Sequence, residues 1–210
     1  MHTKKIVSAG RNLEEAEKVL IMIHGRGALA HDILSLSRHL EVKDFALIAP
    51  QATNNTWYPL SFLAPPGQNE PWLSSALTLL GELVKDIEGK GIKRENIFFL
   101  GFSQGACLTL EFCARNADKW GGVIAFTGGL IGDKIYAENY HGSFEGTPVY
   151  IGTSDPDPHV PVDRVYNSVE ILKSLKAEVT VEVFKNLGHT INQDEIDKVN
   201  SLIFKSNVYK

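Results

Sequence analysis

The stretch from residue 97 to residue 105, Ile-Phe-Phe-Leu-Gly-Phe-Ser-Gln-Gly, decides the fold of this chain. Its apolar first half is typical of a buried strand, and the run from Ala106 to Arg115 behind it is compatible with a helix. Glycines on either side of Ser103 allow a sharp strand-to-helix turn that larger residues would block. Such a turn lifts the serine hydroxyl clear of the backbone, beside the unpaired N–H groups of a helix N-terminus. An ordinary N-cap is the alternative interpretation of this serine.

An acidic segment follows the short apolar run at residues 148–152, which predicts another buried strand. The segment reads Asp-Pro-Asp-Pro-His over residues 155–159. An acid just past the C-terminal end of a parallel strand lies at the same edge of the sheet as the predicted turn at Ser103. On position alone, both Asp155 and Asp157 could serve as the acid that orients a catalytic base.

A histidine follows the last predicted strand. Residues 179–184 alternate in polarity as a strand does, and they lead into a turn that carries Gly188-His189. The chain order of nucleophile, acid and base then agrees with that of hydrolases built on this kind of turn. We therefore predict that His189 takes the proton of Ser103 while a carboxylate orients its imidazole ring. His159 is the alternative base, but it is too close to the acids in sequence to reach the serine while one of them orients it.

A glycine-rich loop after an early strand offers hydrogen-bond donors for the same site. The apolar run at residues 19–23 is followed by His-Gly-Arg-Gly at residues 24–27. A hydrolase of this type takes one oxyanion donor from the residue after the nucleophile and one from such a loop. We predict that these donors are the backbone N–H groups of Gln104 and Arg26, with His24 bracing the loop. A glycine-rich turn without a catalytic role is the alternative.

Together these segments resemble the phospholipase/carboxylesterase family of α/β-hydrolases, which includes bacterial carboxylesterases and the acyl-protein thioesterases. The resemblance extends from Val19 to the C-terminal helix, and the matching pieces are residues 24–27, the turn at Ser103, Asp-Pro-His-Val-Pro at 157–161 and Leu-Gly-His at 187–189. The acid of the family lies in an Asp-x-x-Val-Pro segment, so the resemblance assigns that role to Asp157 rather than Asp155. It also implies hydrolysis of esters or thioesters without a cofactor.

A long segment rich in prolines and aromatic residues, 50–71, separates one predicted strand from the next helix. Irregular segments of this length are usually functional, so we expect it to border the substrate pocket. The candidate substrate-binding residues are Trp57, Tyr58 and Phe62, and the alternative is that these side chains only hold the loop against the core. The family often carries Trp-Phe-Asp here, and this chain has proline in place of the aspartate. The segment 128–146 is a second candidate wall.

Predicted strands and helices alternate along most of the chain, which favours a mainly parallel sheet with helices on both faces. The expected strands are 19–23, 45–49, 97–100, 123–126, 149–152 and 179–184, with an antiparallel edge strand at 6–8. Apolar residues at helical spacing predict helices over 73–87, 165–172 and 196–203. We predict an α/β-hydrolase fold in which residues 1–210 form a single domain without a large cap domain.

Composition narrows the classes of function. The 210 residues are 43% hydrophobic and 22% charged, enough to bury a core, and the net charge of −4 gives no reason to expect nucleic acid as a partner. The apolar runs are shorter than the ~20 residues of a membrane span, so we expect no stable membrane insertion. No signal peptide is recognisable, and a cytoplasmic location is expected. Cys107 and Cys113 are about 9 Å apart along the predicted helix, too far for a disulfide, and are expected to be reduced and semi-buried.

The sequence predicts a serine hydrolase that cleaves carboxylic esters, with thioesters or lysophospholipids as variants of the same chemistry. No cluster of ligating residues and no dinucleotide fingerprint is recognisable, so we expect no metal and no cofactor. The expected partner is a small-molecule or lipid ester, and a homodimer stays open. One alternative is a dienelactone-type hydrolase, although such enzymes carry cysteine where this chain has Ser103. The other alternative is a catalytically silent hydrolase fold that binds a ligand.

Overall fold

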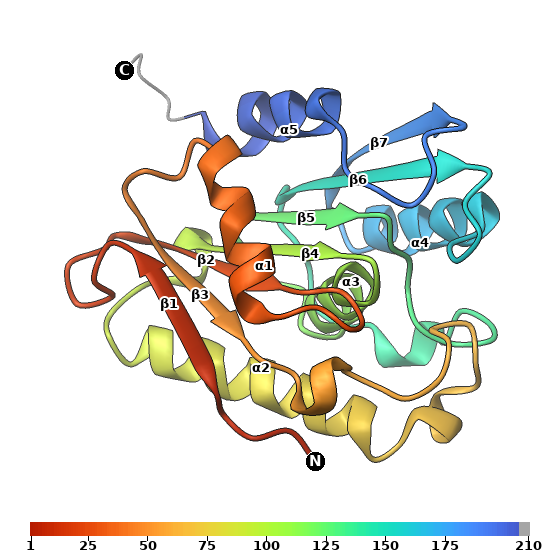
Figure 1. The fold of residues 1–210 in the computed structure, drawn as a ribbon, viewed down its shortest axis with the longest axis horizontal. Coiled ribbons are helices and arrows are strands. Elements are labelled where there is room, and N and C mark those ends of the chain that lie inside the picture. Colours follow the sequence, from red (N-terminus) through yellow and green to blue (C-terminus); the bar gives the residue numbers. More distant parts are fainter. Residues whose placement is uncertain (206–210) are drawn as a thin grey trace.

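Seven strands form one sheet in the computed structural model, which describes residues 1–205 (Figure 1). The strand order is β1-β3-β2-β4-β5-β6-β7, with β1 antiparallel to β3 and every other neighbouring pair parallel. The strands are β1 (Ile6–Gly10), β2 (Lys18–Ile23), β3 (Phe45–Pro50), β4 (Ile97–Phe102), β5 (Gly122–Phe126), β6 (Pro148–Asp155) and β7 (Glu178–Lys185). All the predicted strands are confirmed, the antiparallel edge strand included, and each is longer than predicted by at least one residue.

Helices cover both faces of the sheet, as predicted (Figure 1). The α-helices are α1 (Ala30–Ser35), α2 (Trp72–Glu88), α3 (Gln104–Arg115), α4 (Val162–Ser174) and α5 (Gln193–Val199). Side chains of α2, α3 and α4 share one core on one face, and those of α1 and α5 share another core on the opposite face. Within residues 1–205, no helix combines the length and the hydrophobicity that crossing a bilayer requires.

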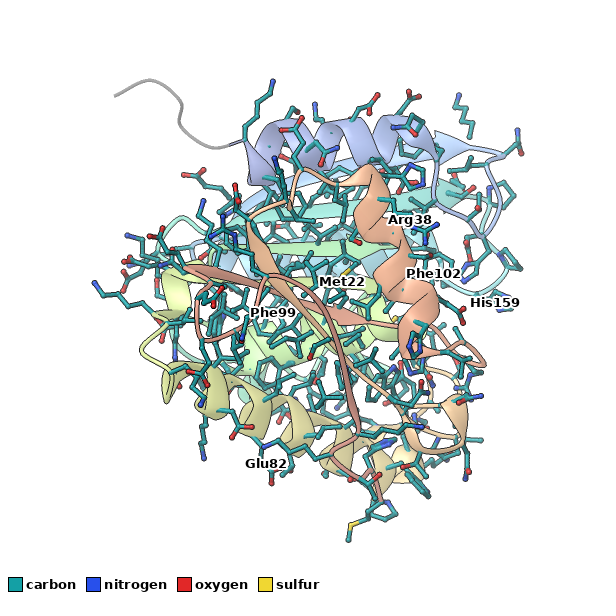
Figure 2. The ribbon with its side chains drawn as sticks, turned by 60° about the vertical axis from the view of Figure 1, so that its left-hand side comes forward. Met22, Arg38, Glu82, Phe99, Phe102 and His159 are labelled. Carbon is teal, nitrogen blue, oxygen red and sulfur yellow. The ribbon has the colours of Figure 1, made fainter. Side chains whose placement is uncertain are left out.

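Alternating side chains of the central strands supply the two cores. In β2, Ile21 packs with the helices α2 to α4, whereas Met22 packs with α1 and α5. In β4, Phe99 and Phe98 divide in the same way. Figure 2 shows Met22 and Phe99 in the interior of the molecule. Because both faces are covered, the strands are apolar at nearly every position, and this is why continuous apolar runs indicated them in the sequence.

The carboxyl ends of the parallel strands meet at one edge of the sheet. The arrows of β4, β5, β6 and β7 all point to this edge in Figure 1. The segments that leave β2, β4, β6 and β7 there contain residues 24–27, Ser103, residues 155–159 and His189, respectively. The open α/β topology therefore brings residues that are far apart in the sequence to one place.

The helix α3 is buried more deeply than predicted. It lies between the sheet and α2, and every residue from Gln104 to Ala114 is buried. Cys107 and Cys113 are free thiols that are almost completely buried, so the expectation that they are semi-buried is wrong. Burial raises the pKa of the Cys107 thiol to about 12, which leaves it protonated and unreactive at neutral pH.

Candidate active site

The turn between β4 and α3 holds Ser103 in a strained backbone conformation. Its φ is 55° and its ψ is −119°, outside the regions that a non-glycine residue normally occupies. The strain persists because the turn is packed tightly. A side chain on Gly101 would collide with the carbonyl of Gly105, and one on Gly105 would collide with the carbonyl of Ile23. Only glycine fits at these two positions, two residues before and two residues after the serine, as the sequence pattern suggested.

Ser103, His189 and Asp157 form a continuous chain of hydrogen bonds. The Nε2 atom of His189 lies 2.7 Å from the Oγ atom of Ser103, and its Nδ1 atom lies 2.8 Å from Oδ2 of Asp157. Because the carboxylate can only accept, Nδ1 carries the proton, which leaves Nε2 free to accept one from the serine. The three side chains come from the segments after β4, β6 and β7, and they meet at the edge where those strands end.

The Asp157 carboxylate is held in its ionised form. Burial of the side chain raises its pKa, but hydrogen bonds from His189 and from the N–H groups of His159 and Val160 together outweigh burial. The two N–H groups donate to Oδ1 over 2.7 Å and 2.8 Å. The net result is a pKa below the ordinary value for aspartate. A charged carboxylate beside Nδ1 then stabilises the imidazolium that forms when His189 accepts a proton.

The structure brings Asp157, and not Asp155, to the histidine. Asp155 is exposed at the end of β6, and its backbone carbonyl accepts a hydrogen bond from the N–H of Asn186. The imidazole that contacts the serine is that of His189, and the ring of His159 packs edge-on against it with the centroids 4.8 Å apart. The ring of Phe102 packs against His189 as well, at 5.3 Å. Figure 2 shows Phe102 and His159 on the same side of the molecule.

Ser154 is a part of the site that sequence reasoning missed. Its buried hydroxyl accepts a hydrogen bond of 3.0 Å from the N–H of Gly188 and donates one of 3.2 Å to the carbonyl of Pro156. The hydroxyl thereby ties the turn that carries His189 to the segment that carries Asp157. A serine near the end of a strand gives no signal of this role, because both of its partners are backbone groups.

Two backbone N–H groups beside Ser103 are free to bind an oxyanion. Among residues 1–205, neither the N–H of Gln104 nor that of Arg26 donates to a protein acceptor, and both residues line the cavity described below. Gly25 lets the two loops approach closely: a Cβ atom built on it would lie 3.5 Å from Cβ of Ser103 and 3.3 Å from the carbonyl of Phe102. Two unpaired N–H groups in segments this close together are candidates for stabilising the negative oxygen of a tetrahedral intermediate.

The side chains of these two residues hold the loop over the site. The guanidinium of Arg26 donates hydrogen bonds of 2.9 Å and 2.6 Å to the carbonyls of Pro59 and Leu60. The amide of Gln104 donates to the carbonyl of Tyr58 over 2.8 Å and accepts from the N–H of Trp57 over 2.9 Å. Each of the two residues therefore offers its backbone to the site and uses its side chain to fix the wall of the cavity.

A cavity of about 640 Å³ opens in front of Ser103. Its lining residues are Gly25, Arg26, Ala28, Tyr58, Pro59, Leu60, Ser61, Phe62, Leu63, Phe102, Ser103, Gln104, Cys107, Pro158, His159, Val160, Pro161 and His189. The lining is mostly apolar, and Arg26 is its one charged side chain among the described residues. Residues 58–63 form a continuous part of the wall, which includes the candidate substrate-binding residues Tyr58 and Phe62.

Trp57 and the segment 128–146 lie behind the cavity wall, and this corrects two expectations. The indole of Trp57 is fully buried because its Nε1–H donates to the carbonyl of His24 over 2.8 Å, which turns the ring into the core. No residue of the segment 128–146 lines the cavity, although its first part packs against the wall: a Cβ atom on Gly129 would lie 3.5 Å from the Phe62 ring. Trp57 is thus a structural residue of the site rather than a surface that substrate contacts.

The loop at 50–71 is less irregular than predicted. It contains 3₁₀ turns at Thr53–Asn55 and Pro66–Asn69, which shorten its irregular part.

Across residues 1–205, no three histidine, cysteine, aspartate or glutamate side chains converge in a way that could hold a metal ion. The groups that the described site offers are a hydroxyl, an imidazole, an ionised carboxylate and two unpaired N–H donors.

Comparisons of sequence and of structure with known proteins find relatives among esterases and thioesterases. The sequence profile of the Phospholipase/Carboxylesterase family matches residues 2–207. Acyl-protein thioesterase 1 of Saccharomyces cerevisiae is 26% identical over 216 residues, which cover 92% of this chain and 95% of the yeast protein. A crystal structure of a phospholipase/carboxylesterase from Dyadobacter fermentans is 54% identical, with a TM-score of 0.96 over 97% of this chain and 98% of that one. The crystal structure of esterase PE8 shares the fold: it is 23% identical, with a TM-score of 0.76 over 93% of this chain and 95% of the PE8 chain.

Proposed function

We propose that this chain, which belongs to the phospholipase/carboxylesterase family of hydrolases, cleaves carboxylic esters and thioesters through a covalent acyl-enzyme on Ser103. The observation that carries the proposal is the pair of short contacts that links Ser103 Oγ to His189 Nε2 and His189 Nδ1 to Asp157. A serine hydroxyl is a weak nucleophile, and a base placed at this distance is what activates it.

The reaction follows from the positions of these groups. Ser103 Oγ attacks the acyl carbonyl while its proton passes to His189 Nε2, and the carboxylate of Asp157 stabilises the imidazolium. The carbonyl oxygen becomes negative and accepts hydrogen bonds from the N–H groups of Gln104 and Arg26. His189 then returns the proton to the departing alcohol or thiol. A water molecule activated by His189 attacks the acyl-enzyme in the same way and releases the acid.

The cavity supports a small-molecule or lipid ester of modest chain length as the substrate. Its wall at residues 58–63 is largely apolar, and each methylene that it buries would stabilise the bound ester by about 0.8 kcal/mol. Both oxygen and sulfur leaving groups suit the mechanism, because the nucleophile and the two donors act on the acyl carbonyl. Yeast acyl-protein thioesterase 1 is a relative, and for that reason thioesters belong in any substrate panel.

The test is the hydrolysis of p-nitrophenyl esters of graded acyl length, and of matched acyl thioesters, by the wild-type protein and by Ser103→Ala. Removing a triad nucleophile costs about 10⁶ in kcat in the subtilisin precedent, so we expect no measurable turnover by the variant. Ser35→Ala, at an exposed serine of α1, is the matched control and should behave as wild type. Activity of Ser103→Ala within tenfold of wild type would refute the assignment of the nucleophile.

A further inference from the structure

His24 lies outside the catalytic triad, yet both nitrogens of its buried ring have partners. Its Nδ1 atom lies 2.7 Å from the carbonyl oxygen of Gly25, and its Nε2 atom lies 3.1 Å from the backbone nitrogen of Ala52. The N–H of Ala52 can only donate, so Nε2 must be the acceptor and Nδ1 must carry the proton. These two backbone groups fix the tautomer of a neutral ring, and burial also lowers the pKa of His24.

The carbonyl that His24 holds belongs to the peptide unit that supplies a predicted oxyanion donor. In a trans peptide the carbonyl of one residue and the N–H of the next point in opposite directions. The Gly25–Arg26 bond is trans, so fixing the Gly25 oxygen on the buried imidazole directs the Arg26 N–H away from it, toward the cavity and Ser103. Without this hydrogen bond, the peptide unit could rotate more readily, because the residue on its N-terminal side is the conformationally permissive Gly25.

Trp57 holds the neighbouring peptide unit in place. Its indole Nε1–H donates a hydrogen bond of 2.8 Å to the carbonyl of His24, and its ring packs against the His24 imidazole with the centroids 5.0 Å apart. The two peptide units that lead into the oxyanion loop are therefore each fixed by a buried aromatic side chain. Neither His24 nor Trp57 lines the cavity, so both side chains act on the oxyanion loop from behind it.

We propose that His24 and Trp57 are positioning residues for the oxyanion hole, with the Nδ1–H of His24 setting the direction of the Arg26 N–H. The proposal rests on the proposed hydrolase function, in which the Arg26 N–H binds the negative oxygen of the tetrahedral intermediate. A correctly directed donor strengthens binding of the transition state more than binding of the substrate. Its loss should therefore lower kcat and leave KM nearly unchanged, whereas loss of packing alone would lower stability.

Two substitutions at His24 separate its two hydrogen bonds. The amide nitrogen of asparagine reaches about the position of Nδ1, so His24→Asn can still donate to the Gly25 carbonyl. The longer glutamine reaches about the position of Nε2, so His24→Gln can accept from the Ala52 N–H but no longer holds that carbonyl. We expect His24→Gln to lose about 10²-fold in kcat, the cost of one oxyanion donor, with KM within threefold of wild type. His24→Asn should stay within tenfold of wild type in kcat.

A boronic acid supplies a second measurement, because it binds a catalytic serine as an anionic tetrahedral adduct, one of whose oxygens occupies the oxyanion hole. We expect the affinity of His24→Gln for butaneboronic acid to fall in parallel with kcat, and that of His24→Asn to follow wild type. Full kcat and unchanged boronate affinity in His24→Gln would overturn the proposal. So would equal losses in His24→Asn and His24→Gln, since the volume of the ring would then matter rather than its donor.

Trp57→Phe keeps an aromatic ring in the core but lacks the indole N–H and part of the ring volume, so its Tm is measured beside its kinetics, and it decides the question if both His24 variants fail to fold. A fall in kcat without a rise in KM supports the proposal, and unchanged kinetics overturn it. Failure of the proposed function itself is distinguishable, because it would appear in the wild-type protein as turnover that survives Ser103→Ala. An effect on positioning leaves the wild-type reaction and its dependence on Ser103 intact.

Discussion

Replacing Glu195 by glutamine should stabilise the protein above neutral pH and leave its stability almost unchanged near pH 4.5. Glu195 lies in the first turn of α5, where its Oε2 accepts a hydrogen bond from the N–H of Asn192 and its own N–H donates to the Asn192 side chain. Its other oxygen, Oε1, is buried against Gly152 of β6 and has no hydrogen-bond partner among residues 1–205. The residue anchors the end of the turn that carries His189 to the sheet.

The magnitude follows from the pKa of this carboxyl group. Burial, with a smaller contribution from nearby Glu182, raises the pKa of Glu195 from the ordinary 4.5 to about 7, against the hydrogen bond from Asn192. The folded protein therefore binds this proton more tightly than the unfolded chain does. The resulting stability is complete below pH 4.5 and is lost as the pH rises through 7. A shift of this size, at 1.36 kcal/mol per pH unit, corresponds to about 3 kcal/mol.

The assay is urea unfolding of the wild-type protein and of Glu195→Gln at a series of pH values from 4.5 to 8.5. Glutamine imitates the protonated acid, so the two proteins should have similar stability at the acidic end. The variant should gain up to about 3 kcal/mol over wild type at the alkaline end. Glu170→Gln, at an exposed glutamate of α4, is the matched control and should show no such trend. A constant difference between Glu195→Gln and wild type across this pH range would refute the reasoning.

Two further predictions concern the acid and the cavity wall. Asp157→Asn should lower kcat by about 10⁴, the cost known for a trypsin-type triad, while Asp155→Asn, at an exposed position, should have little effect. Steady-state kinetics of both variants test this prediction, and a larger loss in Asp155→Asn would reverse the assignment of the acid. Phe62→Ala should flatten the dependence of kcat/KM on acyl length, which a buried chain makes about fourfold per methylene, and leave acetate esters nearly unaffected. Trp57→Ala should instead lower the Tm and lower kcat/KM for all esters by the same factor. A selective loss of activity on long esters in Trp57→Ala would contradict the buried position of that ring.

The order of the strands along the chain could be predicted from the sequence, because a sheet covered on both faces requires apolar runs. The runs at 97–100 and 19–23 correspond to β4 and β2, and the glycines around Ser103 indicated the strained turn. The ends of the strands were harder to place. β6 extends to Asp155, past the apolar run that identified it, because its last residues are held by pairing with β7.

The catalytic candidates could be predicted because each follows a strand and bears a reactive side chain. What the sequence could not provide was the direction of side chains within the loops. Trp57 was expected to line the pocket, but a hydrogen bond to the His24 carbonyl turns it into the core. Ser154 gave no signal because it acts through backbone groups of two loops that meet only in the folded protein. Such contacts depend on tertiary structure rather than on local pattern.

The central claim is that Ser103 is an activated nucleophile, and labelling with a fluorophosphonate tests it most directly. The measurement is the intact mass of the protein after a short reaction at neutral pH, followed by peptide mapping of the adduct. The account predicts a single adduct per chain, located on Ser103, and none on Ser103→Ala or on the wild-type protein after denaturation. A label on another residue, or equal labelling of Ser103→Ala, would contradict it.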